Sequence, residues 1–174
     1  HMKAKITKLL MGISLALSAL LTTSCIGGES SPLISIEFVA LNDSIVLEQP
    51  PVQVGDTLYV GMVLTGYEFP LDHLQINVDR EYFSDAMCGD PKELSSIFTD
   101  FSAPQKGSYL FQKDIKTVAA TWALVPTKAP KDYKEPFAVE LYLKSHAKAD
   151  EKFNPYYRKF WVLIADPTQQ PSAK

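Results

Sequence analysis

Hydrophobic and polar residues alternate with a period of two along most of the chain from residue 33 onward. In segment 34–38, Ile, Ile and Phe alternate with Ser and Glu, and in segment 74–79, Leu, Ile and Val alternate with Gln, Asn and Asp. This alternation is typical of strands with one face in the core and one in water. Similar runs lie between Pro- and Gly-bearing turns at 58–65, 118–124, 137–146 and 160–164, with shorter candidates at 45–48 and 109–113. About eight short strands predict an all-β, two-layer β-sandwich.

A helical signal interrupts the strands. Asp90 is a good N-cap, Pro91 suits the first helical position and Glu93 completes a capping box. Hydrophobic residues then follow at helical spacing, namely Leu94, Ile97, Phe98 and Phe101. The sequence therefore predicts one short helix in an insertion spanning about residues 80–106, and we expect this insertion to cover one edge or end of the sandwich.

The N-terminal segment has the pattern of an export signal. His1 precedes the natural initiator Met2, so we interpret it as a cloning residue, and three lysines then lead into an apolar run at 9–21. That run is too short for a permanent membrane span and is typical of a signal peptide. The following Leu-Thr-Thr-Ser-Cys at 21–25 resembles the lipobox of bacterial lipoproteins, with Thr22 in place of the usual aliphatic residue. The resemblance implies that Cys25 becomes a lipid-bearing N-terminus.

The signal peptide and the turn residues divide the chain into four parts. We expect the cloning residue and signal peptide at 1–24, then the lipidated cysteine with a Gly- and Ser-rich flexible tether at 25–32. The folded domain is predicted at 33–166, and residues 167–174 should form a loose C-terminal tail. Because Ile26 stands where an inner-membrane lipoprotein has Asp, the lipobox resemblance implies an exported protein anchored to the outer membrane. It then faces either the periplasm or the cell surface.

Two further segments carry a family resemblance. Residues 54–60 (Val-Gly-Asp-Thr-Leu-Tyr-Val) and 71–76 (Leu-Asp-His-Leu-Gln-Ile) have the order of a Gly-Asp-initiated second strand and the strand after it. This order resembles the immunoglobulin-like domains of unknown function in bacteroidete lipoproteins. The resemblance covers about 25 residues besides the leader. It implies an immunoglobulin-like β-sandwich at the cell envelope, of a kind that is commonly non-catalytic.

The charge and the cysteine content of the chain narrow the classes of partner that the protein is expected to bind. Three of the 17 basic residues and none of the 20 acidic ones precede residue 25, which leaves 14 basic against 20 acidic residues, a net charge of −6. An acidic domain lacks the basic surface that attracts nucleic acid, and it lacks the polybasic patch that attracts anionic lipid. The expected membrane contact is therefore the lipid on Cys25. Cys88 is then left without an intramolecular partner, and we interpret it as a small, partly buried residue.

The pattern contains no recognisable catalytic or metal site. No Gly-x-Ser-x-Gly element is present, and the two domain histidines, His73 and His146, lie far apart in sequence, where we expect solvated surface. Carboxylates are abundant without an outstanding pair for glycoside hydrolysis. Four of them fall close together but do not follow the spacing of a calcium loop, namely Asp79, Glu81, Asp85 and Asp90. The sequence therefore predicts no catalytic residues, no cofactor and no metal, with calcium near 79–90 left open.

Aromatic residues give the remaining indication of a binding surface. The parity of Trp161 places it on the opposite side of its strand from the apolar Phe160 and Val162. If the strands at 137–146 and 158–165 pair and the strand at 74–79 lies alongside, one outward face carries Tyr142, Tyr157, Trp161, Gln75 and Asn77. Aromatic rings beside amides suit stacking on a sugar. In the alternative interpretation the insertion or a loop folds over Trp161 and buries it.

The preferred functional hypothesis is a non-catalytic envelope lipoprotein that binds a polysaccharide or another envelope protein. The alternative is a structural subunit of an envelope assembly, in which strand edges pair between chains. A glycoside hydrolase that uses two carboxylates is the third and least favoured hypothesis.

Overall fold

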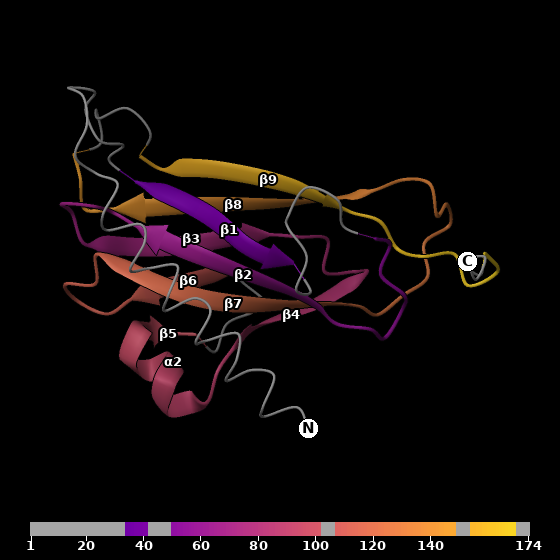
Figure 1. Ribbon diagram of the computed structural model, residues 1–174, viewed down its shortest axis with the longest axis horizontal. Helices are drawn as coiled ribbons and strands as arrows, with labels where there is room; N and C mark the ends of the chain where they lie inside the picture. The colour runs from indigo at the N-terminus through magenta and orange to yellow at the C-terminus, as the bar shows by residue number, and fades with distance from the viewer. Residues whose placement is uncertain (1–33, 42–49, 102–106, 149–153, 170–174) are drawn as a thin grey trace. The chain divides into compact units, whose positions relative to one another are not determined.

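The computed structural model describes residues 34–41, 50–101, 107–148 and 154–169, and its strands form two antiparallel sheets. The four-stranded sheet has the order β1-β2-β7-β4 and the five-stranded sheet has the order β5-β6-β3-β8-β9 (Figure 1). The first sheet consists of β1 (Ser35–Leu41), β2 (Leu58–Thr65), β7 (Thr117–Pro126) and β4 (Phe83–Cys88). The second consists of β5 (Phe98–Asp100), β6 (Ser108–Phe111), β3 (Leu71–Asn77), β8 (Phe137–Ser145) and β9 (Tyr156–Val162).

The strand order is that of an immunoglobulin-like sandwich. In such domains the first, second, fifth and fourth strands form one sheet, and the third, sixth and seventh form the other. If β5 and β6 are left out of the count, β7, β8 and β9 become the fifth, sixth and seventh strands. The two sheets, β1-β2-β7-β4 and β3-β8-β9, then have the same strand order as an immunoglobulin-like domain. The additional strands β5 and β6 extend the second sheet beyond β3, although they follow β4 in the chain. The predicted all-β, immunoglobulin-like two-layer sandwich with one short helix is therefore confirmed.

The inward-facing residues of both sheets form a single core. Alternate positions of β7, β8 and, from Leu74 onward, β3 are buried, as the period-two pattern predicts, whereas β2 is buried on both faces over residues 60–64. The largest fully buried side chain is that of Trp122 on β7. Burying a large apolar side chain stabilises the fold by about 1.5–3 kcal/mol. The core members on these four strands are Leu58, Val60, Met62, Leu64, Ala120, Trp122, Leu124, Leu71, Leu74, Ile76, Val139, Leu141 and Leu143.

The insertion differs from its prediction. Residues 83–88 form strand β4, which was not predicted, because its inward positions read Phe-Asp-Met and the charged Asp85 breaks the apolar pattern. Helix α2 (Pro91–Ile97) has the predicted capping box, in which the Glu93 N–H donates to Asp90 Oδ1 at 2.8 Å. The helix ends earlier than predicted, because Phe98 enters strand β5 and packs its ring 5.1 Å from that of Phe111.

The ends of the predicted strands also shift. Strand β9 begins at Tyr156, four residues before the predicted start at 160, and Ile164 forms an isolated parallel bridge with Val52. The candidate strand at 45–48 and the predicted signal peptide, Cys25 and tether lie outside the described residues.

Candidate functional site

The outward side of β3, β8 and β9 collects the predicted binding residues on one surface. We call it the aromatic face and define it as Gln75, Asn77, Glu140, Tyr142, Tyr157, Lys159 and Trp161. The strand register arranges these residues in rows across the sheet. Gln75, Tyr142 and Tyr157 form the first row. Asn77, Glu140 and Lys159 form the second, and Trp161 lies opposite Ala138 in the third.

The rows are joined by specific contacts. The rings of Tyr142 and Tyr157 lie 4.9 Å apart between centroids, with their planes tilted by 42°. In the next row, Lys159 Nζ lies 3.7 Å from Glu140 Oε1 and 4.2 Å from the centroid of the Trp161 ring. Tyr142 therefore contacts Tyr157 rather than Trp161, and an ion pair separates the two aromatic rows.

Hydrogen bonds orient the polar groups of the aromatic face. The Tyr142 hydroxyl donates to Glu140 Oε2 at 3.3 Å, and the Gln75 amide donates to Asn77 Oδ1 at 3.1 Å. The Tyr142 hydroxyl is partly shielded from water, which raises its pKa, and the negative charge of Glu140 is the second cause of this rise. The Tyr142 hydroxyl consequently stays protonated at neutral pH and remains a hydrogen-bond donor.

The alternative in which the insertion or a loop buries Trp161 is wrong. The Trp161 side chain is 55% exposed and that of Tyr157 is 44% exposed. The insertion lies elsewhere, because β4 pairs with β7 in the other sheet, and β5 forms the opposite edge of the five-stranded sheet from β9. An exposed tryptophan beside an exposed tyrosine therefore remains open to solvent.

Sequence reasoning missed one cluster at the end of this sheet. Asp72 lies between the two histidines, with its Oδ2 3.0 Å from His73 Nδ1 and its Oδ1 3.7 Å from His146 Nε2. The pairing of β3 with β8 brings the three residues together, and only a correct strand register could have revealed this. Within the described segments, no group of three His, Cys, Asp or Glu side chains is placed to hold a metal ion. The cluster therefore joins both histidines to one carboxylate.

The four acidic residues considered for calcium have separate roles. The Asp85 side chain is 1% exposed and accepts bonds from Arg80 Nε at 3.1 Å, Arg80 Nη2 at 3.2 Å and Trp122 Nε1 at 3.1 Å. Asp79 accepts from the Glu81 backbone N–H, Asp90 caps α2, and Glu81 pairs with Lys128. The four carboxylates therefore have different protein partners, and Asp85 points into the core toward Arg80.

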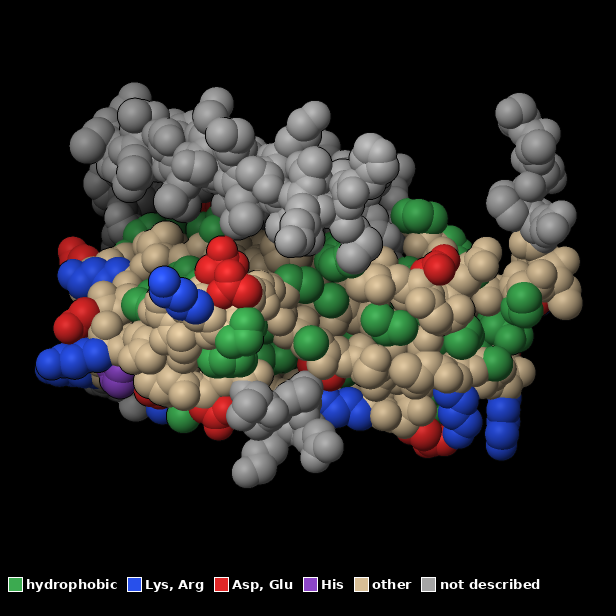
Figure 2. Space-filling view, turned by 90° about the horizontal axis from the view of Figure 1, so that it is seen from below, with side chains coloured by type: hydrophobic (Ala, Val, Ile, Leu, Met, Phe, Trp, Pro, Cys, Tyr) green, Lys and Arg blue, Asp and Glu red, His purple; other side chains and the backbone are tan. Residues whose placement is uncertain are grey.

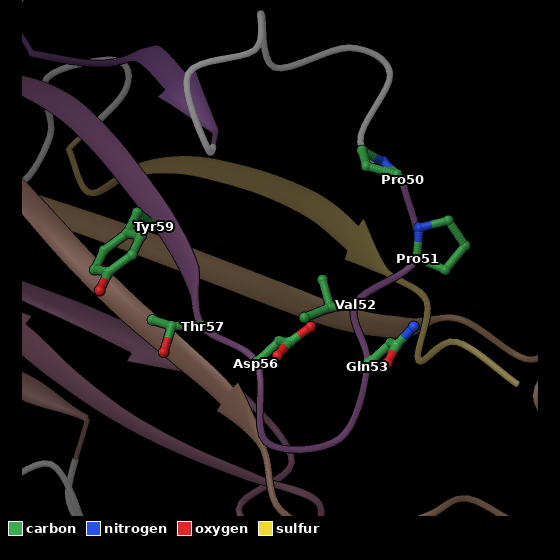
Figure 3. Close-up of a pocket in the computed structure, with 7 residues that line it drawn as sticks. All are labelled: Pro50, Pro51, Val52, Gln53, Asp56, Thr57 and Tyr59. Atoms are coloured by element: carbon green, nitrogen blue, oxygen red, sulfur yellow. The ribbon is translucent and has the colours of Figure 1, made fainter. Parts of the chain in front are cut away.

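A shallow hollow is lined by residues between Pro50 and Tyr59 (Figure 3). Its volume is about 340 Å³, and none of the aromatic-face residues lines it. A single carboxylate, that of Asp56, lines the hollow, so its walls contain no carboxylate pair for glycoside hydrolysis. The seven lining residues are Pro50, Pro51, Val52, Gln53, Asp56, Thr57 and Tyr59.

The surface charges are mixed in sign. In the view of Figure 2, acidic and basic side chains stand next to one another rather than in a field of one sign. The part of the chain that the structure describes also contains no helix long and apolar enough to cross a bilayer.

No family model matches the chain, and no curated protein matches it either. Two solved structures share a general likeness. The first is "AvmM Catalyzes Macrocyclization in Alchivemycin A Biosynthesis", at 12% identity and a TM-score of 0.46, over 81% of this chain and 92% of that one. The second is the human CEP192 PapD-like domain 7, at 9% identity and a TM-score of 0.31, over 83% of this chain and 97% of that one. Neither likeness is close enough to bear on function.

Proposed function

We propose that the protein is a non-catalytic lipoprotein of the cell envelope, anchored through lipid on Cys25, that binds a glycan through the aromatic face. The observation that carries this proposal is the open position of Trp161 and Tyr157, which are 55% and 44% exposed on the same side of one strand. Large aromatic side chains usually lie in the core or against a partner, so two exposed ones on a rigid sheet favour a binding surface.

The chemistry of the aromatic face favours a sugar as the ligand. A sugar ring has C–H groups on its faces and hydroxyls around its edge, and the aromatic face offers both kinds of partner. The rings of Tyr157 and Trp161 supply apolar contact area, while Gln75, Asn77 and Glu140 supply hydrogen-bonding groups that can fix orientation. An acidic polymer such as nucleic acid is disfavoured by the net charge of −6 that remains after residue 24, where 14 basic residues stand against 20 acidic ones.

The carboxylates near the aromatic face support a non-catalytic role. Glu140 contacts the Tyr142 hydroxyl and the Lys159 ammonium, and Asp72 contacts two histidines, so these contacts do not pair either carboxylate with a second carboxyl group. A glycoside hydrolase instead uses a pair of carboxyl groups on either side of the scissile bond.

Trp161→Ala tests the proposal, with Tyr59→Ala as a matched control. Tyr59 is 41% exposed, but it lies on β2 in the other sheet. We expect Trp161→Ala to reduce retardation strongly in polysaccharide-containing native gels, while the thermal midpoint falls by no more than a few degrees, because an exposed side chain contributes little to stability. Tyr59→Ala should retain binding.

Two results would contradict the proposal. One is undiminished polysaccharide binding by Trp161→Ala. The other is a loss of about 3–5 kcal/mol in the free energy of unfolding, which is the cost of truncating a core tryptophan.

A further inference from the structure

We propose that the aromatic face binds the interior of an extended, linear polysaccharide that lies along β9, with Tyr157 and Trp161 stacking on two different sugars of the same chain. This inference rests on the glycan-binding function proposed above and specifies the class of glycan.

The spacing of the two exposed rings carries the argument. Tyr157 and Trp161 are four residues apart on β9, so both point outward from the same side of the strand. At roughly 3.3 Å per residue, their backbone positions are about 13 Å apart. A pyranose ring is about as wide as the aromatic ring on which it stacks, so one sugar cannot cover both. A ligand that uses both rings must contain several linked sugars.

The residues between the two rings define the middle of the ligand. Lys159 lies between Tyr157 and Trp161 in the sequence and pairs with Glu140 on the neighbouring strand. The side chains of Lys159 and Glu140 are 33% and 30% exposed, so their charged groups remain accessible to ligand hydroxyls. A lipid chain would meet this ion pair at the centre of the aromatic face. A polysaccharide offers hydroxyls there and C–H surfaces on either side.

The open form of the aromatic face favours internal segments of the polymer. Its residues occupy successive outward positions of three neighbouring strands, and none of them lines the hollow at Pro50–Tyr59. Recognition of a chain end usually needs a closed pocket that fits the terminal sugar, whereas a sheet surface accepts a chain that continues in both directions.

The experiment uses the protein without its signal peptide and four named polymers, hydroxyethylcellulose, xylan, mannan and starch, in affinity gel electrophoresis. For each polymer that retards the protein, calorimetry then compares its hexasaccharide, trisaccharide and monosaccharide. We expect the hexasaccharide to bind at least about 100-fold more tightly than the monosaccharide, because only the longer ligand reaches both rings. Borohydride reduction of the hexasaccharide end should leave the affinity unchanged.

Variants separate the two stacking positions. Tyr157→Ala and Trp161→Ala should each weaken hexasaccharide binding about tenfold or more, and the double variant should lose it. Tyr157→Phe and Trp161→Phe keep an aromatic ring and should retain most of the affinity, which guards against loss through misfolding.

The outcomes distinguish the inference from the proposed function. If the monosaccharide binds as tightly as the hexasaccharide, or if end reduction abolishes binding, the extended-chain inference is overturned while glycan binding stands. The same holds if only Trp161 affects hexasaccharide affinity. If none of the four polymers retards the protein, both the inference and the proposed function are overturned.

Discussion

Tyr109 is a buried residue whose polar hydroxyl group is poorly accommodated by its surroundings. Its side chain is fully buried on β6, and its hydroxyl has no hydrogen-bond partner among the described residues, since Trp122 donates its indole N–H to Asp85. Burial, followed by the charge of Asp85, raises the pKa of Tyr109 to about 12. A buried hydroxyl without a partner costs free energy that a phenylalanine at the same place avoids.

We therefore expect Tyr109→Phe to leave the free energy of unfolding at pH 7 unchanged or slightly higher, within about 1 kcal/mol. The folded pKa of about 12 exceeds the ordinary value of 10, so the stability linked to the neutral hydroxyl is complete below pH 10 and is lost as the pH rises toward 12. Urea unfolding of both proteins across this range should show a smaller alkaline decline in the variant. A loss of more than about 2 kcal/mol at pH 7 would show that the hydroxyl has a partner.

Among the elements, β4 has an unusual inward charge on an edge strand. It pairs only with β7 in the four-stranded sheet, and Asp85 points from it into the core, where Arg80 and Trp122 satisfy the carboxylate. An inward charge on an edge strand discourages another chain from adding to that edge, because pairing would disturb the buried ion pair. This feature counts against an assembly that joins subunits through β4.

Asp85→Ala should lower the free energy of unfolding by about 3 kcal/mol, because it removes the carboxylate that accepts from Arg80 Nε and the Trp122 indole N–H. Asp79→Ala is the control, since the Asp79 side chain accepts a hydrogen bond from the Glu81 backbone N–H within a turn, and its loss should cost about 1 kcal/mol or less. Chemical denaturation measures both values. Equal effects for the two variants would contradict the central role of Asp85.

The sequence patterns predicted the elements unevenly. Alternation located β2, β7 and β8 closely, because their inward positions are apolar except for Ser145 at the end of β8. It missed β4, where Asp85 occupies a core position, and it assigned Phe98 to the helix, because short apolar runs fit both helical and strand spacing. For the candidate site, the alternation of residues along β9 correctly placed Trp161 on the outward side of the strand. The ion pair between the aromatic rows and the Asp72 cluster required the strand register, which parity does not provide.

At the scale of the whole molecule, the proposed anchor is tested by Cys25→Ser in the producing cell. Acyl chains contribute about 0.8 kcal/mol per buried methylene, so loss of a multiply acylated cysteine should release the protein from membranes. Labelling by a fatty-acid analogue should disappear as well. Cys88→Ser is the matched control, because burial raises the pKa of Cys88 and keeps it a thiol within the fold. Unchanged membrane partition of Cys25→Ser would reject the lipoprotein proposal.

Contacts within and between the two sheets join partners that lie far apart along the chain, and this slows folding. Thr65 on β2 bonds Thr117 on β7, which follows it by 52 positions, and Arg158 on β9 donates to the Ile36 carbonyl on β1 across 122 positions. Domains built from such distant pairings fold in about milliseconds to seconds, far more slowly than helical bundles. The four-stranded sheet cannot be completed before β7 is available, and the five-stranded sheet cannot be completed before β9 near the C-terminus is available. That order is compatible with the export proposed above, in which the chain crosses a membrane before it folds.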